Sequence, residues 1–267
     1  MEASRSTRVL LRVFTVLALG FIYIPIGVIF LYAFNGNTSL QWPIQSVTLE
    51  WFGRALVDEG IRDALLLSLQ VAILATVVAV VLGTLAAFAV QRYHFFGRET
   101  VSFLVILPIA LPGIVTGMAL NAAFRNTGVP LGTLTIVIGH ATFCVVTIYN
   151  NAVARLRRTS RSLEEASMDL GADTFQTFRY VTFPALRSAL IAGALLAFGL
   201  SFDEVIVTTF TAGLQQTLPI WILSNYLRPN QAPLVNVVAM VVVLISLVPI
   251  YLASRLSSDA GSIAGSR

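Results

Sequence analysis

The sequence predicts an all-α membrane protein with six transmembrane helices and both termini in the cytoplasm. Three observations lead to this fold class. First, only 11% of the 267 residues are charged and 57% are hydrophobic, whereas about 25% of the residues of an ordinary soluble domain are charged. Second, six apolar runs approach or exceed the ~20 residues that a helix needs to cross a bilayer. Third, most of the arginines lie in the tails and loops on one side of the predicted helices.

The apolar runs define the order of the predicted helices. They are Val13–Phe34, Ala64–Val90, Val101–Ala123, Leu131–Val153, Leu186–Phe210 and Leu234–Leu252. Arginines precede the first run, as in a signal peptide, but this run is longer than the usual apolar core of about 7 to 15 residues. We therefore expect a retained helix over 13–34, a cytoplasmic tail over 1–12 before it, and a second tail over 255–267.

The distribution of arginine predicts the orientation. Thirteen of the 17 arginines lie in the two tails, in the loop 91–100, and in the loop 154–185 with Arg187 at its edge, while four lie in the three opposite loops. Because cytoplasmic loops are enriched in basic residues, we expect the tails and the long fourth loop in the cytoplasm. The same sorting argues against nucleic acid as a partner, since the basic residues form no single patch.

Few side chains could carry catalysis. The chain has no lysine, which excludes a P-loop ATPase and a Schiff-base lysine. Its one cysteine, Cys144, cannot form an intrachain disulfide or a cysteine metal cluster, and we expect it to pack as a small apolar residue. His140 lies within a predicted span, where we expect it to be neutral and hydrogen-bonded. The sequence therefore favours a protein that is not an enzyme and binds no metal or cofactor itself.

Two prolines interrupt the third predicted helix. Pro108 and Pro112 each remove a backbone donor and clash with the preceding helical turn. A lipid-exposed helix tolerates this poorly, so we expect a bent segment that either lines a cavity or is bent for packing alone.

Small residues at a spacing of four predict close approach of helix backbones. They are Gly83 with Ala87, and Ala189 with Gly193 and Ala197. The spacing is common in helix bundles and does not indicate a substrate.

The long cytoplasmic loop predicts two short helices. Ser162 and Glu165 form a capping box for the first helix, and Gly171 is placed to end it in a left-handed conformation. One face of this helix would carry Leu163, Ala166, Ser167 and Leu170. Asp173 and Gln176 repeat the capping pattern, and Pro184 is expected to limit the second helix. An apolar face outside the bilayer indicates a protein partner or the underside of the chain itself.

The same loop resembles the EAA loop of permease subunits of bacterial ABC importers, whose pattern is E-A-A-x-x-x-G followed after nine residues by [IV]-x-L-P. The matching or nearly matching residues are Glu165, Ala166, Ser167, Gly171, Ala172 and Pro184. Serine at 167 and phenylalanine at 183 replace the family's alanine and leucine. The resemblance implies that loop 155–184 is the element that couples the permease to a cytoplasmic ATPase. It also implies a type I importer transmembrane domain over 62–254, with the helix over 13–34 added to it.

Three further segments, Leu111-Pro-Gly113, Asp169-Leu-Gly-Ala172 and Ser201-Phe-Asp-Glu204, make the resemblance strongest to permeases of spermidine/putrescine importers. It implies a subunit of the bacterial inner membrane that imports polyamine with a dimeric ATPase, a second permease and an extracytoplasmic solute-binding protein, in contact with membrane lipid. ATP and Mg²⁺ would then bind the ATPase. The same machinery could carry an amino-acid derivative, a ferric ion or an oxyanion. An ion-coupled carrier is a weaker alternative, because such carriers usually hold several intramembrane ionisable residues.

Asp203 and Glu204 are the two acidic residues expected within a span. Intramembrane carboxylates are costly and therefore candidates for a substrate pathway, here for a cation. The alternative is structural, because Ser-Phe-Asp-Glu at 201–204 also reads as a capping box for a second half-helix. Trp221 and Tyr226, in the outer loop expected after this helix, could assist a cation or anchor the chain at the membrane interface.

Overall fold

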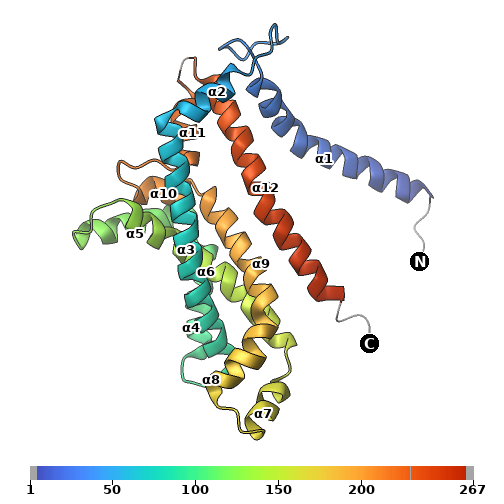
Figure 1. Cartoon of the computed structure of the whole chain (residues 1–267), viewed down its shortest axis with the longest axis vertical. Helices are drawn as coiled ribbons and strands as arrows, with labels where there is room; N and C mark the ends of the chain where they lie inside the picture. The colour runs from blue at the N-terminus through green and yellow to red at the C-terminus, as the bar shows by residue number, and fades with distance from the viewer. Residues whose placement is uncertain (1–4, 229, 263–267) are drawn as a thin grey trace. The chain divides into compact units, whose positions relative to one another are not determined.

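A computed structural model describes residues 5–228 and 230–262 of the chain, and within these residues it contains helices and no β-strand, apart from an isolated bridge between Asn35 and Val47. Figure 1 shows the order of the helices. Their bounds are α1 Arg5–Ala33, α2 Glu50–Val57, α3 Glu59–Arg92, α4 Arg98–Ala110, α5 Gly113–Asn126, α6 Thr133–Arg158, α7 Arg161–Asp169, α8 Thr174–Thr177, the π-helix η1 Phe178–Thr182, α9 Phe183–Phe202, α10 Ile206–Thr211, α11 Leu218–Tyr226 and α12 Ala232–Ser262. The all-helical prediction is confirmed for this part of the chain.

The chain divides into two compact units. The smaller comprises 1–62 with 222–244, and the larger comprises 63–221 with 245–267. In the smaller unit, α2 is attached to the residues that follow α1, because the indole Nε1–H of Trp51 donates to the Asn35 carbonyl at 2.8 Å and the rings of Phe34 and Phe52 lie 5.1 Å apart. The larger unit contains the candidate site.

The terminal helices extend beyond the predicted apolar runs. The first helix begins at Arg5 rather than at Val13, and α12 continues to Ser262. Parts of the segments expected as tails are therefore helical, while 1–4 and 263–267 of those tails lie outside the described residues. The difference has a simple cause. The length of an apolar run reflects the thickness of the hydrocarbon layer of the membrane. A helix can continue beyond that layer with polar residues.

Among the described residues, four helical segments are long and apolar enough to span a membrane: Thr7–Ala33, Glu59–Arg92, Thr133–Arg158 and Thr174–Phe202. The pair α4 and α5 would make a fifth span, although its two halves are bent by 106°. The apolar part of α12, Ala232–Val248, is shorter. Six spans and cytoplasmic termini therefore remain predictions. The fifth predicted helix, Leu186–Phe210, is wrong at its end, since α9 stops at Phe202 and a separate helix, α10, follows.

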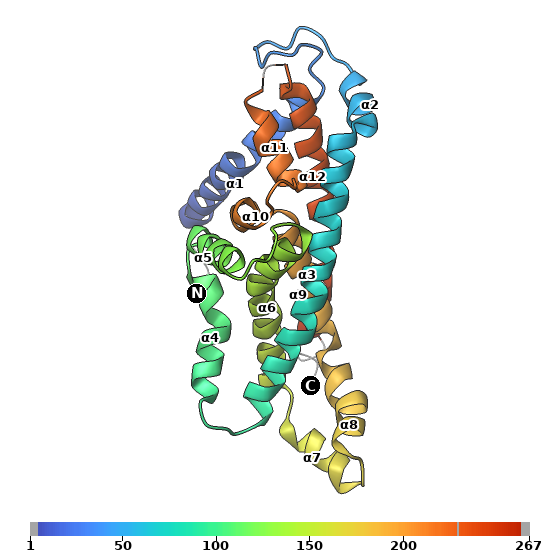
Figure 2. The ribbon, with the colours of Figure 1, turned by 90° about the vertical axis from the view of Figure 1, so that its left-hand side faces the viewer.

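Small residues allow the helices of the larger unit to pack closely, as the spacing predicted. A methyl group added at Gly83 of α3 would lie 2.9 Å from Ile148 Cβ and 2.9 Å from the Val145 carbonyl oxygen of α6. At Gly193 of α9 it would lie 3.2 Å from Ile148 Cδ1. Helix α6 is thus held between α3 and α9, and Figure 2 shows it running beside α4 as well.

We expect Gly83→Ala to destabilise the protein by about 1–3 kcal/mol, because the added methyl group overfills the contact between α3 and α6. Gly199→Ala is the matched control, since a methyl group at Gly199 of α9 would meet nothing within 4 Å. That change should alter stability by less than about 1 kcal/mol. Thermal unfolding of the purified protein in lipid nanodiscs measures both. Equal losses would contradict the close approach at Gly83.

Candidate functional site

The first helix of the protrusion, residues 159–184, begins two residues earlier than the capping pattern predicted. Ser160, not Ser162, is the N-cap of α7, and its hydroxyl oxygen accepts the Ser162 amide at 3.3 Å. Glu165 therefore lies within the helix and pairs with Arg161 at 3.4 Å. Ser160 and Ser162 are separated by one residue. The local sequence pattern does not indicate which of them caps the helix.

The turn at Gly171 agrees with the prediction. Gly171 has φ of +92°, a conformation that a side chain disfavours. Its amide donates to the Met168 carbonyl at 2.9 Å, and the Ala172 amide donates to the Ser167 carbonyl at 3.1 Å. The predicted box after it is also confirmed, because the Asp173 carboxylate accepts the Gln176 amide at 2.8 Å and the Gln176 side chain accepts the Asp173 amide at 2.9 Å.

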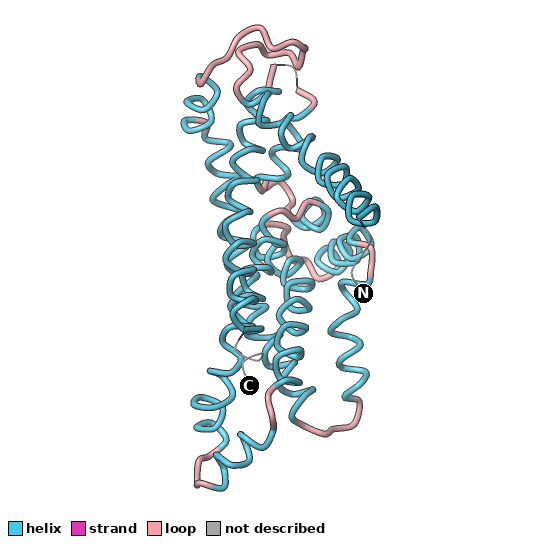
Figure 3. The backbone as a smooth tube through the Cα atoms, turned by 90° about the vertical axis from the view of Figure 1, so that its right-hand side faces the viewer, coloured by secondary structure: helices cyan, strands magenta, loops and turns pink. Residues whose placement is uncertain are grey.

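Pro184 does not limit the second helix, contrary to the prediction. Helix α8 passes through the π-helix η1 into α9, and Pro184 lies in the first turn of α9. The Phe183 amide bonds to the Phe178 carbonyl, five residues back. This wider turn explains why the helix continues, since π-turns accommodate local interruptions of the regular ladder. Loop 155–184 is thus joined to the transmembrane part by continuous helix (Figure 3).

The apolar side chains of the protrusion lie in the open. Leu170 is 90% exposed, and Leu163, Met168 and Phe175 are also exposed. The buried residue of α7 is Glu164, which the sequence analysis did not single out. Ser167 is half-buried, and its hydroxyl lies 3.1 Å from that of Thr177. Of the two covers expected for this apolar face, the underside of the chain does not bury it in the structure.

The second part of the site is the break between α9 and α10. Asp203 caps the end of α9 and is exposed, while the Glu204 carboxylate accepts the Val207 amide at 3.0 Å and so caps α10. The capping box predicted over 201–204 is not formed, because Ser201 lies inside α9 and its hydroxyl meets His140. Glu204 has a different structural contact, with the first turn of α10. No arginine among the described residues forms an ion pair with either carboxylate.

A second break faces this one. Helix α4 ends at Ala110, Pro112 is the N-cap of α5, and Pro108 lies inside α4. The prolines do bend this segment, as expected, and Figure 2 shows α5 lying across the end of α4. A cavity of about 210 Å³ lies at the break, lined by Pro108, Ile109, Leu111, Gly113, Thr116, Thr142, Phe143, Leu200, Glu204 and Val207. The buried hydroxyl oxygen of Thr116 has no hydrogen-bond partner among the described residues.

Helix α10 is held in place by polar contacts with α5 and α6. The Asn121 side-chain amide donates to the Phe210 carbonyl, and the Thr135 hydroxyl donates to the Thr211 carbonyl at 2.7 Å. A methyl group at Gly117 would collide with the ring of Phe210, so the side chain of Phe210 packs directly against the backbone of α5. These bonds supply partners that the interrupted backbone would otherwise lack.

His140 connects α6 to both sides of the α9–α10 break. Its Nδ1 lies 2.7 Å from the Ser201 hydroxyl and its Nε2 lies 2.8 Å from the Thr208 hydroxyl. Thr208 already donates to the Glu204 carbonyl at 2.8 Å, so it accepts from Nε2–H and Nδ1 accepts from Ser201. The expected neutral, hydrogen-bonded histidine is thus found, and Cys144 is fully buried, as expected of an apolar packing residue.

The two aromatic candidates for the substrate pathway lie outside the cavity. Trp221 and Tyr226 lie in helix α11 rather than in a loop. Trp221 is buried, Tyr226 is exposed, and neither lines the cavity. Among residues 5–228 and 230–262, no group of three or more His, Cys, Asp or Glu side chains could hold a metal ion.

Comparison with known proteins gives consistent matches. The model of a family described as the inner membrane component of binding-protein-dependent transport systems matches residues 79–259. The chain is 35% identical over 236 residues to the putrescine transport system permease protein PotI of Escherichia coli strain K12, covering 85% of this chain and 83% of PotI. It is 30% identical over 241 residues to the spermidine/putrescine transport system permease protein PotC of the same strain, covering 90% of each.

A solved structure supports the fold. A chain from the crystal structure of a bacterial ABC transporter involved in the import of the acidic polysaccharide alginate matches with a TM-score of 0.70 and 18% identity, covering 97% of this chain and 99% of that chain. At this identity the likeness concerns the fold alone.

We expect His140→Phe to destabilise the protein by about 1–3 kcal/mol, because the buried Ser201 hydroxyl loses its acceptor. Cys144→Ala, one turn further along the same buried face, should cost at most about 1 kcal/mol, because the Cys144 Sγ makes only a weak 3.4 Å contact with the Ala197 carbonyl. Thermal unfolding in nanodiscs compares the two variants. A smaller loss for His140→Phe than for Cys144→Ala would show that the hydroxyl network contributes nothing beyond packing.

Proposed function

The chain belongs to the family of inner membrane components of binding-protein-dependent transport systems, and from this we propose that it is the polyamine-translocating permease subunit of an ATP-driven importer. A solute-binding protein delivers the polyamine from outside. A second permease, homologous or identical, completes the pathway, and two copies of a cytoplasmic ATPase bind ATP and Mg²⁺. The relatives named for putrescine and spermidine transport support the choice of polyamine.

The exposed protrusion is the observation that carries the coupling role. Helices α7 and α8 form the end of the larger unit, beyond the loop between α3 and α4 (Figure 2). Their exposed leucines and Phe175 would be unfavourable in water unless a partner covered them. A groove of the ATPase is the proposed cover, with Glu165, Ala166 and Gly171 at the contact. The absence of lysine agrees with this division of labour, because the ATP chemistry must reside in another chain.

The cavity at the two helix breaks is the proposed place where the cargo passes. The last turns of α4 and α9 both line it. Helix C-termini carry a partial negative charge, and interrupted helices commonly coordinate cations with such ends in transporters. Glu204 lines the cavity and Asp203 is its neighbour in the chain, without an arginine to neutralise either. The first turn of α5 lines the same cavity, so the helix ends alone do not select the sign of the charge. The Glu204 carboxylate is what favours a polyamine or another cation over an oxyanion.

We expect Gly171→Pro to reduce polyamine uptake by at least about tenfold and to uncouple ATP hydrolysis from transport, because proline cannot adopt φ of +92°. Gly128→Pro is the matched control. Gly128 also has positive φ, and its amide also bonds three residues back, but it follows α5. Uptake of labelled spermidine and ATP hydrolysis are measured in proteoliposomes, with the protein in the membrane quantified. Normal coupling in Gly171→Pro would contradict the role of the protrusion.

We expect Asp203→Asn to raise KM for spermidine by about tenfold, because one carboxylate contact to the cation is lost. Glu99→Gln, at an exposed position in the first turn of α4, should leave KM unchanged. Competition by unlabelled putrescine, an amino acid and sulfate in the same assay tests the class of cargo. Unchanged kinetics in Asp203→Asn would exclude Asp203 from the pathway, and competition by sulfate alone would contradict a cationic cargo.

A further inference from the structure

One buried ion pair attaches helix α7 to the rest of the larger unit. The Glu164 carboxylate oxygens lie 2.9 Å and 3.0 Å from the Arg92 Nε, and the Thr182 hydroxyl donates to the same carboxylate at 3.0 Å. The two charged side chains are only 11% and 9% exposed. A single carboxylate on α7 therefore bonds to the end of α3, 72 positions away in the sequence, and to η1, 18 positions away.

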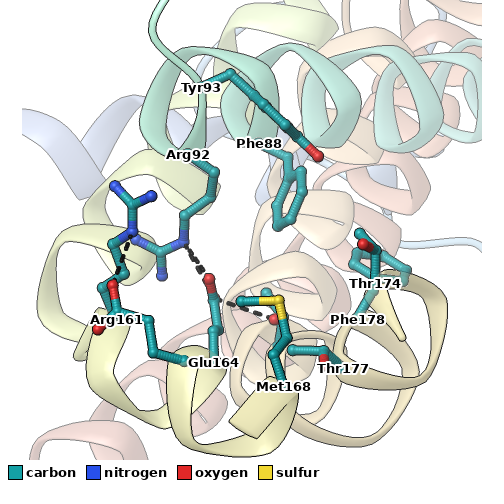
Figure 4. Close-up of a pocket in the computed structure, with 11 residues that line it drawn as sticks. Phe88, Arg92, Tyr93, Arg161, Glu164, Met168, Thr174, Thr177 and Phe178 are labelled. Atoms are coloured by element: carbon teal, nitrogen blue, oxygen red, sulfur yellow. Dashed lines mark hydrogen bonds and ion pairs between the residues drawn. The ribbon is translucent and has the colours of Figure 1, made fainter. Parts of the chain in front are cut away.

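The Glu164 carboxylate connects α7 to the segments that lead to the long apolar helices. Arg92 is the last residue of α3, and Thr182 is the last residue of η1, which leads directly into α9. Figure 4 shows Arg92 reaching down from the end of α3 toward Glu164 on α7. Helices α3 and α9 are both long apolar segments of the transmembrane part.

Little apolar packing supports this attachment. A cavity of about 200 Å³ lies around the pair, bordered by Phe88, Tyr93, Met168 and Phe178 among others. The leucines of α7 are exposed rather than packed against the unit. Besides the Glu164 contacts, the hydroxyls of Ser167 and Thr177 meet at 3.1 Å, but these tie α7 only to its neighbour α8. The ion pair is thus the polar link between α7 and α3.

The adjacent pair on the same helix offers a direct contrast. Arg161 and Glu165 lie 3.4 Å apart, and both side chains are 58% exposed. Exposed pairs of this kind contribute little, whereas removal of one partner from a buried pair leaves an uncompensated charge. The arrangement of Glu164 therefore resists separation of α7 from α3 far more strongly than that of Glu165.

We propose that Arg92 and Glu164 are positioning residues that make α7 and the end of α3 move as one body during ATP-driven import. The inference rests on the proposed coupling role of the protrusion and adds the internal link through which it acts. Glu165 and its exposed neighbours meet the ATPase, and Glu164 passes the movement to α3 and α9. The two adjacent glutamates then have separate tasks, one outward and one inward.

The test combines a distance with a transport ratio. Spin labels are attached to cysteines introduced at Ser162 on α7 and at Phe96 beyond α3, both exposed positions, while the native cysteine is buried. In the assembled transporter we expect one narrow distance distribution, the same without nucleotide and with ATP. Glu164→Gln should broaden it and make it depend on ATP, and should lower transport per ATP by about tenfold, with the ATPase still bound.

Controls keep the outcomes distinct. Arg62→Gln removes an exposed pair with Glu59 at the start of α3, outside the protrusion, and should leave both readouts unchanged. If Glu164→Gln fails to reach the membrane, Arg92→Lys carries the test, because it keeps the charge but loses the planar guanidinium, and it should give a partial loss of both. An unchanged distance distribution or an unchanged transport ratio in the variant overturns the proposal. A wild-type chain that shows no ATP-dependent uptake and no bound ATPase would instead overturn the proposed function.

Discussion

Every backbone amide and carbonyl within a membrane must find a partner inside the protein, and this constraint governs the whole structure. The chain breaks two of its apolar segments, near Pro112 and after Phe202, and side chains hold the helix that follows the second break. Glu204 caps α10, Asn121 bonds to the Phe210 carbonyl, and His140 ties both sides of the second break to α6. The cavity exists because these replacements allow two helix ends to face each other without unravelling.

Features that depend on neighbouring residues were predictable from the sequence. The apolar runs located the long helices, the four-residue spacing located the close approach at Gly83, and the turn at Gly171 followed from local chemistry. The predictions were wrong where contacts with distant parts of the chain determine where a helix ends. Helix α9 ends at Phe202 because α10 is captured by α5 and α6, and the helix through Pro184 continues because a π-turn absorbs the proline. Neither feature can be inferred from hydropathy or from capping patterns.

The two glutamates at 164 and 165 show the same limit at the site itself. They are chemically identical and adjacent, and the family pattern selects the second. The first is buried because Arg92, 72 positions away in sequence, lies where α3 ends beside α7. A helix turns by about 100° per residue, so neighbours of equal charge inevitably face different surroundings. One sequence can identify the loop that carries the function, but the division of roles within it requires the fold.

The exposed leucines of the protrusion also bear on how the subunit is made. Apolar surface left in water costs about 25 cal/mol per Å², and Leu170 leaves nearly all of its side chain there. If the ATPase covers this surface, as proposed, a copy synthesised without the ATPase would carry this cost and would expose a binding site for chaperones and proteases. The amount of permease that persists in the cell would then depend on the amount of the protein that covers the protrusion. The two proteins would have to be produced in matching amounts.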